Sequence, residues 1–180
     1  MSQEQKNAAV EMSFNAENNI ATLTLRMEGR ANKINEAFGV GLLEAMEWAH
    51  SLEGLEGIII TSGHKDFCVG ADIDSMFVER DAAKVLESTT KLNALFNKIE
   101  TSKQPVVVAL NGSALGGGFE LALACHRRIA LDNPRAKFGL PEVTLGLIPG
   151  AGGTQRLPRL VGIQTALDFI LQGKMVRPSK

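Results

Sequence analysis

The residues best suited to chemistry lie in three glycine-marked loops, each of which follows an apolar stretch of the chain. These loops are residues 67–74, 111–120 and 138–154. In the second loop, three consecutive glycines (Gly116–Gly118) lead into a predicted helix, and Glu120 falls in its first turn. Glycine leaves backbone N–H groups unobstructed, and the start of a helix carries unsatisfied donors and a partial positive charge. The loop therefore suits the stabilisation of a developing anion beside a carboxylate.

The third loop places a second carboxylate, Glu142, directly after Pro141, which restricts the backbone at that point. Each loop also has a plainer interpretation, which the residues alone leave open. The glycines allow close packing of helix against strand, with Glu120 simply favourable to the helix dipole. Glu142 is then a solvated loop residue, and Asp72 or Asp74 of the first loop caps the short helix that follows.

Several other chemistries lack their usual motifs in this chain. Neither GxGxxG nor GxxxxGK[ST] occurs, which argues against dinucleotide and P-loop nucleotide binding. GxSxG is also absent, which argues against a serine hydrolase. The three histidines show no spacing to Asp or Glu that suggests a ligand set, so no metal site is predicted.

The elements that must position these loops follow from hydrophobic periodicity. Alternating or continuous apolar runs predict strands, and apolar residues three and four apart predict helices. The predicted strands are 10–14 and 20–26, forming a hairpin, together with 57–61, 106–110 and 128–131. The predicted helices are 35–52, capped by Asn35, 81–102, a short helix after Gly118, 154–160 and 164–171. Buried strands alternating with helices indicate an α/β fold with a parallel sheet.

Size and composition are those of one ordinary globular domain, with 180 residues, 44% of them hydrophobic and 22% charged. A net charge of -1 gives no electrostatic reason to expect nucleic acid as a partner. Cys68 and Cys125 are far apart in sequence and are predicted to be reduced thiols. Apolar runs such as 106–110 are too short to cross a bilayer, and residues 1–10 lack the pattern of a secretory signal. The expectation is a cytoplasmic protein without a membrane span.

Three segments, taken in order, resemble the crotonase (enoyl-CoA hydratase/isomerase) family. They are GADI at 70–73, NGSALGGGFELALAC at 111–125 and FGLPEVTLGLIPGAGGTQRLPRLVG at 138–162. Within the family the chain looks most similar to the hydratase part of the fatty-acid-oxidation multifunctional enzyme, of the trifunctional-protein α-subunit type. A similar CHRR region and a longer loop around residues 132–134 carry that likeness. Because such relatives have further C-terminal helices, residues 1–180 are expected to be a hydratase core at the N-terminal end of a longer chain.

The resemblance implies a fold and a set of roles. The fold is a spiral of ββα repeats giving two roughly perpendicular sheets flanked by helices. The family's oxyanion hole falls on the backbone N–H groups of Ala71 and Gly117. Its two glutamates fall on Glu120, which positions and activates water, and Glu142, which supplies a proton to C2 of the substrate. The further positions expected to contact the substrate or its coenzyme A are Val69, Gly70, Asp72, Ile73, Gly116 and Gly118.

The implied activity is syn addition of water across the C2=C3 bond of a trans-2-enoyl-CoA in fatty-acid β-oxidation. Members that only shift a double bond commonly keep just the equivalent of Glu142, so the presence of both glutamates favours hydration, with Δ3–Δ2 isomerisation as a side activity. No metal or redox cofactor is expected, since coenzyme A is part of the substrate. The expected partners are an acyl-CoA thioester and, in the full-length protein, an oligomer or a multienzyme complex. Two alternatives stay open: a non-catalytic acyl-CoA-binding or assembly module, and an enzyme that is mainly an isomerase.

Overall fold

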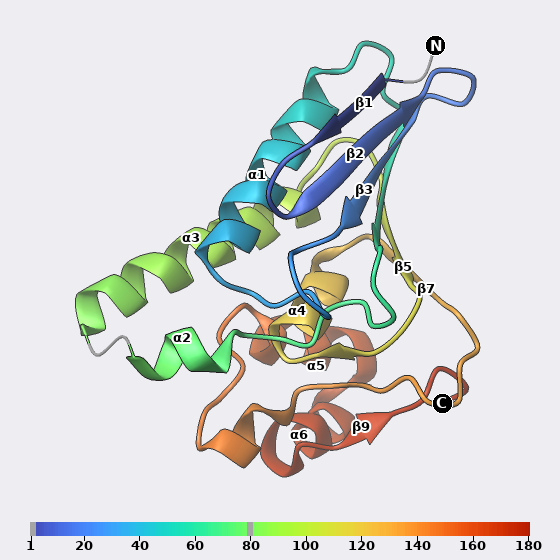
Figure 1. The fold of residues 1–180 in the computed structure, drawn as a ribbon. Coiled ribbons are helices and arrows are strands. Elements are labelled where there is room, and N and C mark those ends of the chain that lie inside the picture. The colour runs from blue at the N-terminus through green and yellow to red at the C-terminus, as the bar shows by residue number, and fades with distance from the viewer. Residues whose placement is uncertain (1–2, 79–80) are drawn as a thin grey trace.

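The computed structural model describes residues 3–78 and 81–180. Its strands are β1 (Gln3–Lys6), β2 (Val10–Asn15), β3 (Ile20–Leu25), β4 (Gly57–Ser62), β5 (Val106–Leu110), β6 (Ala114–Leu115), β7 (Arg127–Ala130), β8 (Phe138–Gly139) and β9 (Met175–Val176). Six of them form one sheet in the order β1-β2-β3-β4-β5-β7 (Figure 1). The first three are antiparallel neighbours, whereas β3, β4, β5 and β7 run parallel.

The helices connect these strands. They are α1 (Glu36–Ser51), α2 (Ile73–Val78), α3 (Ala82–Glu100), α4 (Gly117–Ala124), α5 (Gly153–Val161) and α6 (Ile163–Gln172), with a 3-10 helix η1 (Pro141–Leu145). α1 and α3 lie side by side along one face of the large sheet (Figure 1). None of the helices within the described ranges combines the length and apolar character that a membrane crossing requires.

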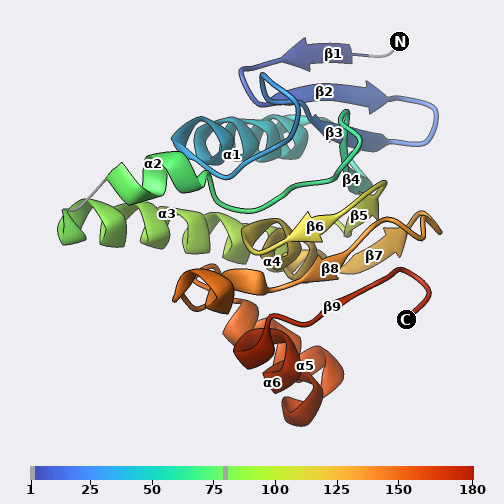
Figure 2. The same cartoon turned by 60° about the horizontal axis from the view of Figure 1, so that its bottom comes forward.

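The second, smaller sheet has the order β6-β8-β9 and lies nearer to α5 and α6 (Figure 2). Its strands follow the large-sheet strands along the chain: β5 leads to β6 and then α4, and β7 leads to β8 and then η1 and α5. The same pattern occurs after β4, because Cys68 forms a parallel bridge with Ala114 before the chain enters α2. The predicted spiral of ββα units with two sheets is therefore confirmed.

The longer elements match the sequence predictions within one or two residues. The Asn35 side chain caps α1 by accepting a hydrogen bond from the N–H of Phe38 at 3.0 Å, as predicted. The elements absent from the prediction are β1, β6, β8, β9 and η1. Every residue of β1 is exposed, so no apolar alternation marks it, and the two-residue strands are too short to show a period.

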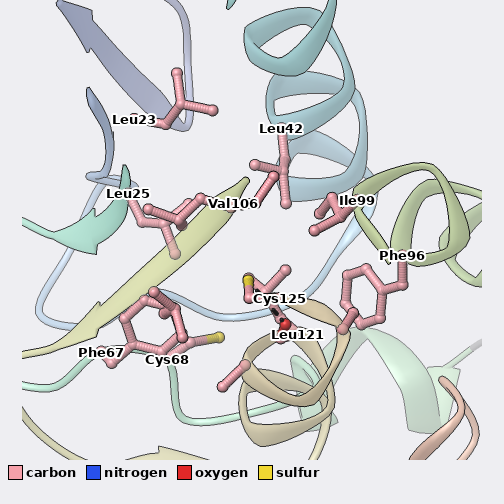
Figure 3. Packing of buried hydrophobic residues seen from close by; sticks show 14 of the residues in the cluster. Leu23, Leu25, Leu42, Phe67, Cys68, Phe96, Ile99, Val106, Leu121 and Cys125 are labelled. Carbon is pink, nitrogen blue, oxygen red and sulfur yellow. Dashed lines mark hydrogen bonds between the residues drawn. The ribbon is translucent and has the colours of Figure 1, made fainter. Parts of the chain in front are cut away.

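The hydrophobic core lies between the large sheet and the helices. Leu42 of α1, Phe96 and Ile99 of α3, and Leu121 of α4 all point into it and are fully or almost fully buried (Figure 3). On the other side of α4, Phe119 stacks against Phe138 of β8 and Phe169 of α6, with ring centroids 6.3 and 6.4 Å away. Packing from both sides fixes the orientation of α4, the helix that carries Glu120.

Cys68 and Cys125 are buried free thiols, as predicted. Burial raises the pKa of each to about 12, so both stay protonated at neutral pH. They serve as small apolar side chains in the core (Figure 3).

Asn32 is a fully buried polar residue that joins the ends of β3 and β4 to the first glycine-marked loop. Its side-chain NH₂ lies within hydrogen-bonding distance of Leu25 O at 3.2 Å, Ser62 Oγ at 2.9 Å and Phe67 O at 2.9 Å. Its Oδ1 accepts from the N–H of Met27 at 3.0 Å. Its backbone carbonyl accepts from the N–H of Val69 at 3.1 Å. A buried amide with this many partners holds three backbone segments in one arrangement.

We expect Asn32→Ala to lower the free energy of unfolding by about 2–4 kcal/mol, because each buried group left without a partner costs about 1–3 kcal/mol. Urea denaturation measures the loss. Asn18→Ala is the control, since Asn18 accepts one exposed bond, from the N–H of Ile20, and its loss should cost less than about 1 kcal/mol. Equal effects of the two substitutions would contradict a central role for Asn32.

Candidate active site

The first two glycine-marked loops run against each other. Cys68 pairs with its neighbour loop through two hydrogen bonds, from its N–H to Ser113 O at 3.2 Å and from the N–H of Leu115 to its own carbonyl at 3.0 Å. Gly70 has a φ of +95°, and a Cβ at this position would lie 2.9 Å from Leu115 O. Both the backbone conformation and the close approach therefore require glycine here. The result is a tight junction between the GAD loop and the turn that begins α4.

The N–H of Ala71 points out of this junction. Ala71 forms a parallel bridge with Ile34, in which Ile34 donates to Gly70 O at 2.8 Å and Asp72 donates to Ile34 O at 2.9 Å. Because these bonds come from the residues that flank Ala71, its own N–H faces away from Ile34. Among the described residues it has no acceptor, so it is available to a ligand.

The three consecutive glycines have three different reasons to be glycine. Gly116 has a φ of +52°, and a Cβ there would lie 3.1 Å from Glu142 Oε1. A Cβ on Gly117 would lie 2.6 Å from Ile34 Cδ1, and one on Gly118 would clash with Cys68 O. Glycine at position 118 is therefore explained by close packing, the plainer interpretation. The Gly116–Gly117 turn, in contrast, keeps the backbone close to a carboxylate.

The N–H of Gly117 is the second donor left without an acceptor among the described residues, as expected for the first residue of a helix. The N–H of Gly116, in contrast, donates to Gly139 O at 2.9 Å. The junction of the two loops therefore offers two N–H donors, from Ala71 and Gly117. These are the positions on which the family resemblance places an oxyanion hole, and that role stays a prediction.

Glu120 projects from the first turn of α4 and is only 2% exposed. Its Oε1 accepts two backbone hydrogen bonds, from Ala151 at 2.8 Å and Gly153 at 2.7 Å. Within the described ranges its Oε2 has no such partner, and it lies 3.9 Å from the point where a Cβ on Gly117 would stand. Burial raises the pKa of Glu120, while the two N–H donors and the charge of Arg156 act against the rise. One oxygen is therefore fixed and the other is left for chemistry.

Glu142 reaches the same turn from η1. Its Oε1 faces Gly116, and its Oε2 is buried without a hydrogen-bond partner in the described part of the chain. Burial raises the pKa of Glu142 to about 7, and the neighbouring charge of Glu120 adds to the rise. A carboxyl with this pKa is present in both protonation states near neutral pH, as a group that donates a proton requires.

The structure thus brings Glu120, Glu142, Ala71 and Gly117 to one place, although they come from three loops. Gly70, Gly116 and Gly118 form the backbone between them. Asp72 is engaged by Lys33 Nζ at 3.1 Å, and Ile73 is the first, partly exposed residue of α2. The N–H of Val69 is taken by Asn32. Direct substrate contact by Val69, Asp72 and Ile73 stays a prediction.

In the described residues, His, Cys, Asp and Glu side chains form no group of three or more that could hold a metal ion. The chemistry that this arrangement can perform is acid–base chemistry beside a pair of N–H donors. Such a pair suits an oxygen that gains negative charge, for example the carbonyl of a thioester during enolate formation.

Comparison with known proteins agrees with this geometry. The family profile described as enoyl-CoA hydratase/isomerase matches residues 15–180. The chain belongs to this family. The match includes both glutamates and the two loops that carry Ala71 and Gly117.

Two kinds of relatives are similar over almost the whole chain. The fatty acid oxidation complex subunit alpha of Shewanella halifaxensis is 42% identical over 176 residues, which are 95% of this chain and 25% of that protein. Solved enoyl-CoA hydratase structures from Geobacillus kaustophilus and Thermoplasma volcanium superpose with TM-scores of 0.93 and 0.87 at 31% and 32% identity. They cover 99% and 96% of this chain, which in turn covers 66% and 67% of theirs. The chain thus spans about a quarter of the length of the curated relatives and about two thirds of the solved ones.

Sequence reasoning missed the residues that hold the site in place. Asn32 was missed because an isolated Asn carries no sign of burial in the sequence. Arg156 anchors the 150–153 segment, and it too was not singled out, because a lone Arg on a helix usually faces solvent. The extended apolar and glycine patterns that did find the loops say nothing about such single polar contacts.

We expect the side-chain carboxyl of Glu142 to titrate with a midpoint of about 7 in carbon-13 NMR spectra of glutamate-labelled protein. In Glu120→Gln the midpoint should fall, because the charge of Glu120 contributes to the raised pKa. Glu87, exposed and hydrogen-bonded to Lys91, is the internal control and should titrate below the usual glutamate value. A Glu142 midpoint near 4.5 would contradict the geometry described for its buried carboxyl.

The raised pKa of Glu142 also predicts how stability changes with pH. The folded state holds the proton of Glu142 up to a pH of about 7, whereas the unfolded chain releases it near 4.5. The contribution of Glu142 to the stability of the folded state is therefore greatest below about pH 4.5, and it falls as the pH rises to about 7. Glu142→Gln removes this loss and should be more stable than the unmodified protein at pH 8 by about 1–2 kcal/mol, after allowance for partial exposure. A difference that does not shrink between pH 8 and pH 5 would count against this linkage.

Proposed function

We propose that this chain is the catalytic core of an enoyl-CoA hydratase acting on trans-2-enoyl-CoA in fatty-acid β-oxidation. The observation that carries the proposal is that the carboxyls of Glu120 and Glu142 meet at the Gly116–Gly117 turn. Among the described residues, Oε2 of each carboxyl has no hydrogen-bond partner, and the neighbouring N–H groups of Ala71 and Gly117 have no acceptor. Family membership and the relatives named as enoyl-CoA hydratases support it.

In the proposed reaction the thioester oxygen accepts hydrogen bonds from the N–H groups of Ala71 and Gly117. Each such donor is typically worth about 2.7–4 kcal/mol toward an oxyanion. Glu120 Oε2 binds a water molecule and takes its proton as the water oxygen bonds to C3. Glu142 gives its proton to C2, where the electron pair of the former double bond is held as an enolate. Proton exchange with solvent then restores both carboxyls, so that one water is added in total.

The arrangement of the carboxyls supports syn addition. Both reach the same turn, Glu120 from α4 and Glu142 from η1, so that the hydroxyl and the proton arrive at one face of the double bond. The fixed Oε1 of Glu120 leaves a single oxygen to orient the water, which limits the angle of attack. Double-bond migration between C3 and C2 needs only proton transfer by one base, and Glu142 supports it as a side activity.

A non-catalytic acyl-CoA-binding module is the second candidate. The two N–H donors alone would serve it, because they bind a thioester oxygen without any acid or base. The burial of Glu120 argues against it, since a carboxylate is costly to bury and gives nothing to simple thioester binding.

The wider setting is also part of the proposal. Because the fatty acid oxidation relatives are about four times longer than the matched region, we place this hydratase within a larger subunit that passes its 3-hydroxyacyl product to further steps of β-oxidation. An oligomer or multienzyme complex, a cytoplasmic location and independence from metal or redox cofactors stay predictions of the sequence.

We expect Glu120→Gln and Glu142→Gln each to slow hydration of crotonyl-CoA by about 10²–10⁴-fold, the usual contribution of general acid–base groups. Loss of the enoyl absorbance measures the rate, and a 3-enoyl-CoA substrate measures isomerisation separately. Glu87→Gln, at an exposed position on α3 paired with Lys91, is the control and should keep full activity. A folded protein that binds crotonyl-CoA but does not hydrate it would favour the binding module instead.

A further inference from the structure

The two donors that fix Glu120 belong to a short segment, Gly150–Gly153. Its local backbone hydrogen bonds are at Gly152, whose carbonyl accepts from the N–H groups of Gln155 and Arg156 in the first turn of α5. Ala151 and Gly153 point their N–H groups at Glu120 Oε1. Gly152, between them, has a φ of +98°, a conformation that favours glycine. A segment with three glycines in four residues is costly to order, so its geometry has to come from contacts with the rest of the protein.

Arg156 provides the first of these contacts. Its guanidinium is anchored on α5, one turn after the segment, and its side chain is 10% exposed. Nη1 donates to Ala151 O at 3.0 Å, so the two sides of Ala151 are held at once, the N–H by Glu120 and the carbonyl by Arg156. The same Nη1 occupies the place where a Cβ on Gly152 would stand. Glycine at position 152 therefore leaves room for the guanidinium as well as allowing the turn.

The second set of contacts lies on α3. Arg156 donates from Nε to Glu100 Oε2 at 2.9 Å and from Nη2 to Asn97 Oδ1 at 2.7 Å. Asn93 donates from Nδ2 to Gly150 O at 2.8 Å. Asn93, Asn97 and Glu100 are four and then three residues apart, so they share one face of the helix. One polar face of α3 thus holds the 150–153 segment at two points. It bonds directly to Gly150 and, through Arg156, to Ala151.

We propose that Arg156, fastened to α3 by Asn97 and Glu100, is a positioning residue that aims the N–H groups of Ala151 and Gly153 at Glu120 and so orients its free oxygen toward the reacting water. The guanidinium suits this task, because its planar set of donors reaches a carbonyl, an amide oxygen and a carboxylate at the same time. A lysine ammonium carries the charge without that fixed geometry. This inference rests on the proposed hydratase function for its kinetic consequence, whereas its structural consequence is independent of any substrate.

The structural consequence is tested first, by amide NMR without substrate. An N–H that donates to a carboxylate gives a strongly downfield proton signal and exchanges slowly with solvent. In Arg156→Met the amide signals of Ala151 and Gly153 should move upfield and exchange at least about tenfold faster, because the charge-assisted contacts that order the segment are lost. Arg159→Met is the matched control, since Arg159 lies on the same helix and, in the part of the chain that the structure describes, its side chain bonds only to Gln155. It should leave both amide signals unchanged.

The kinetic consequence separates positioning from simple stabilisation. Arg156→Met should lower kcat for crotonyl-CoA hydration by about tenfold or more while KM changes less than about threefold, because misaligned water affects the reaction and not substrate binding. Arg156→Lys should recover part of kcat. If Arg156→Met does not fold, Asn97→Ala removes one anchor of the guanidinium and should produce smaller changes in the same directions.

The outcomes are distinct. Unchanged Ala151 and Gly153 amides, or a lower melting temperature with unchanged kcat, would overturn the positioning role and leave Arg156 as a structural link between α3 and α5. Shifted amides in a protein that shows no hydration even when unmodified would uphold the placement of Arg156 and refute the hydratase function instead.

Discussion

A carboxylate that is buried needs hydrogen-bond donors close by, and Glu120 imposes this requirement on much of the molecule. Two backbone N–H groups meet this requirement. Their position explains the glycine at 153, because a Cβ there would lie 2.9 Å from Glu120 Oε1, and the glycine at 152, which has a φ of +98° in the turn between the two donors. It also accounts for the direction of the turn before α5 and for the polar face of α3. The core supports the same demand, because α4 is packed on both sides and cannot turn its carboxylate away from these donors. The Glu120 carboxylate is thus placed by backbone geometry, and side chains serve to hold that backbone.

The other half of the site depends on how the ββα units follow one another. In each unit the chain leaves the large sheet, pairs briefly in or beside the small one, and only then enters a helix. The loops at 68–73 and 115–120 occupy equivalent places in successive units and therefore come to lie together. The backbone hydrogen bonds of this junction use N–H groups on one side of the loops. The N–H groups of Ala71 and Gly117 lie on the other side. Asn32 and Ile34 complete the junction from a third segment, so three stretches far apart in sequence set the direction of one N–H.

Much of this was predictable from the sequence, for a physical reason. Long amphipathic segments such as 36–51 can be recognised by their helical period, and buried strands such as 106–110 by their continuous apolar run. Glycine clusters mark places where a side chain cannot fit. The family resemblance added the spiral arrangement, which periodicity alone does not contain. What the sequence could not yield were contacts that depend on distant neighbours. The exposed, polar β1 is a strand only because β2 offers its edge, and Arg156 differs from Arg159 only in which atoms surround it.

The origin of the two N–H donors has a consequence for how such a site can change over evolutionary time. Every residue type except proline carries a backbone N–H, so most substitutions at Ala71 preserve the group that would polarise a carbonyl. The two carboxyls are not preserved in this way, because a single codon change can remove either of them. Under the proposed mechanism, change in this scaffold is therefore asymmetric: the two backbone donors for a thioester oxygen persist through most substitutions, whereas a few replaceable side chains determine which reaction follows.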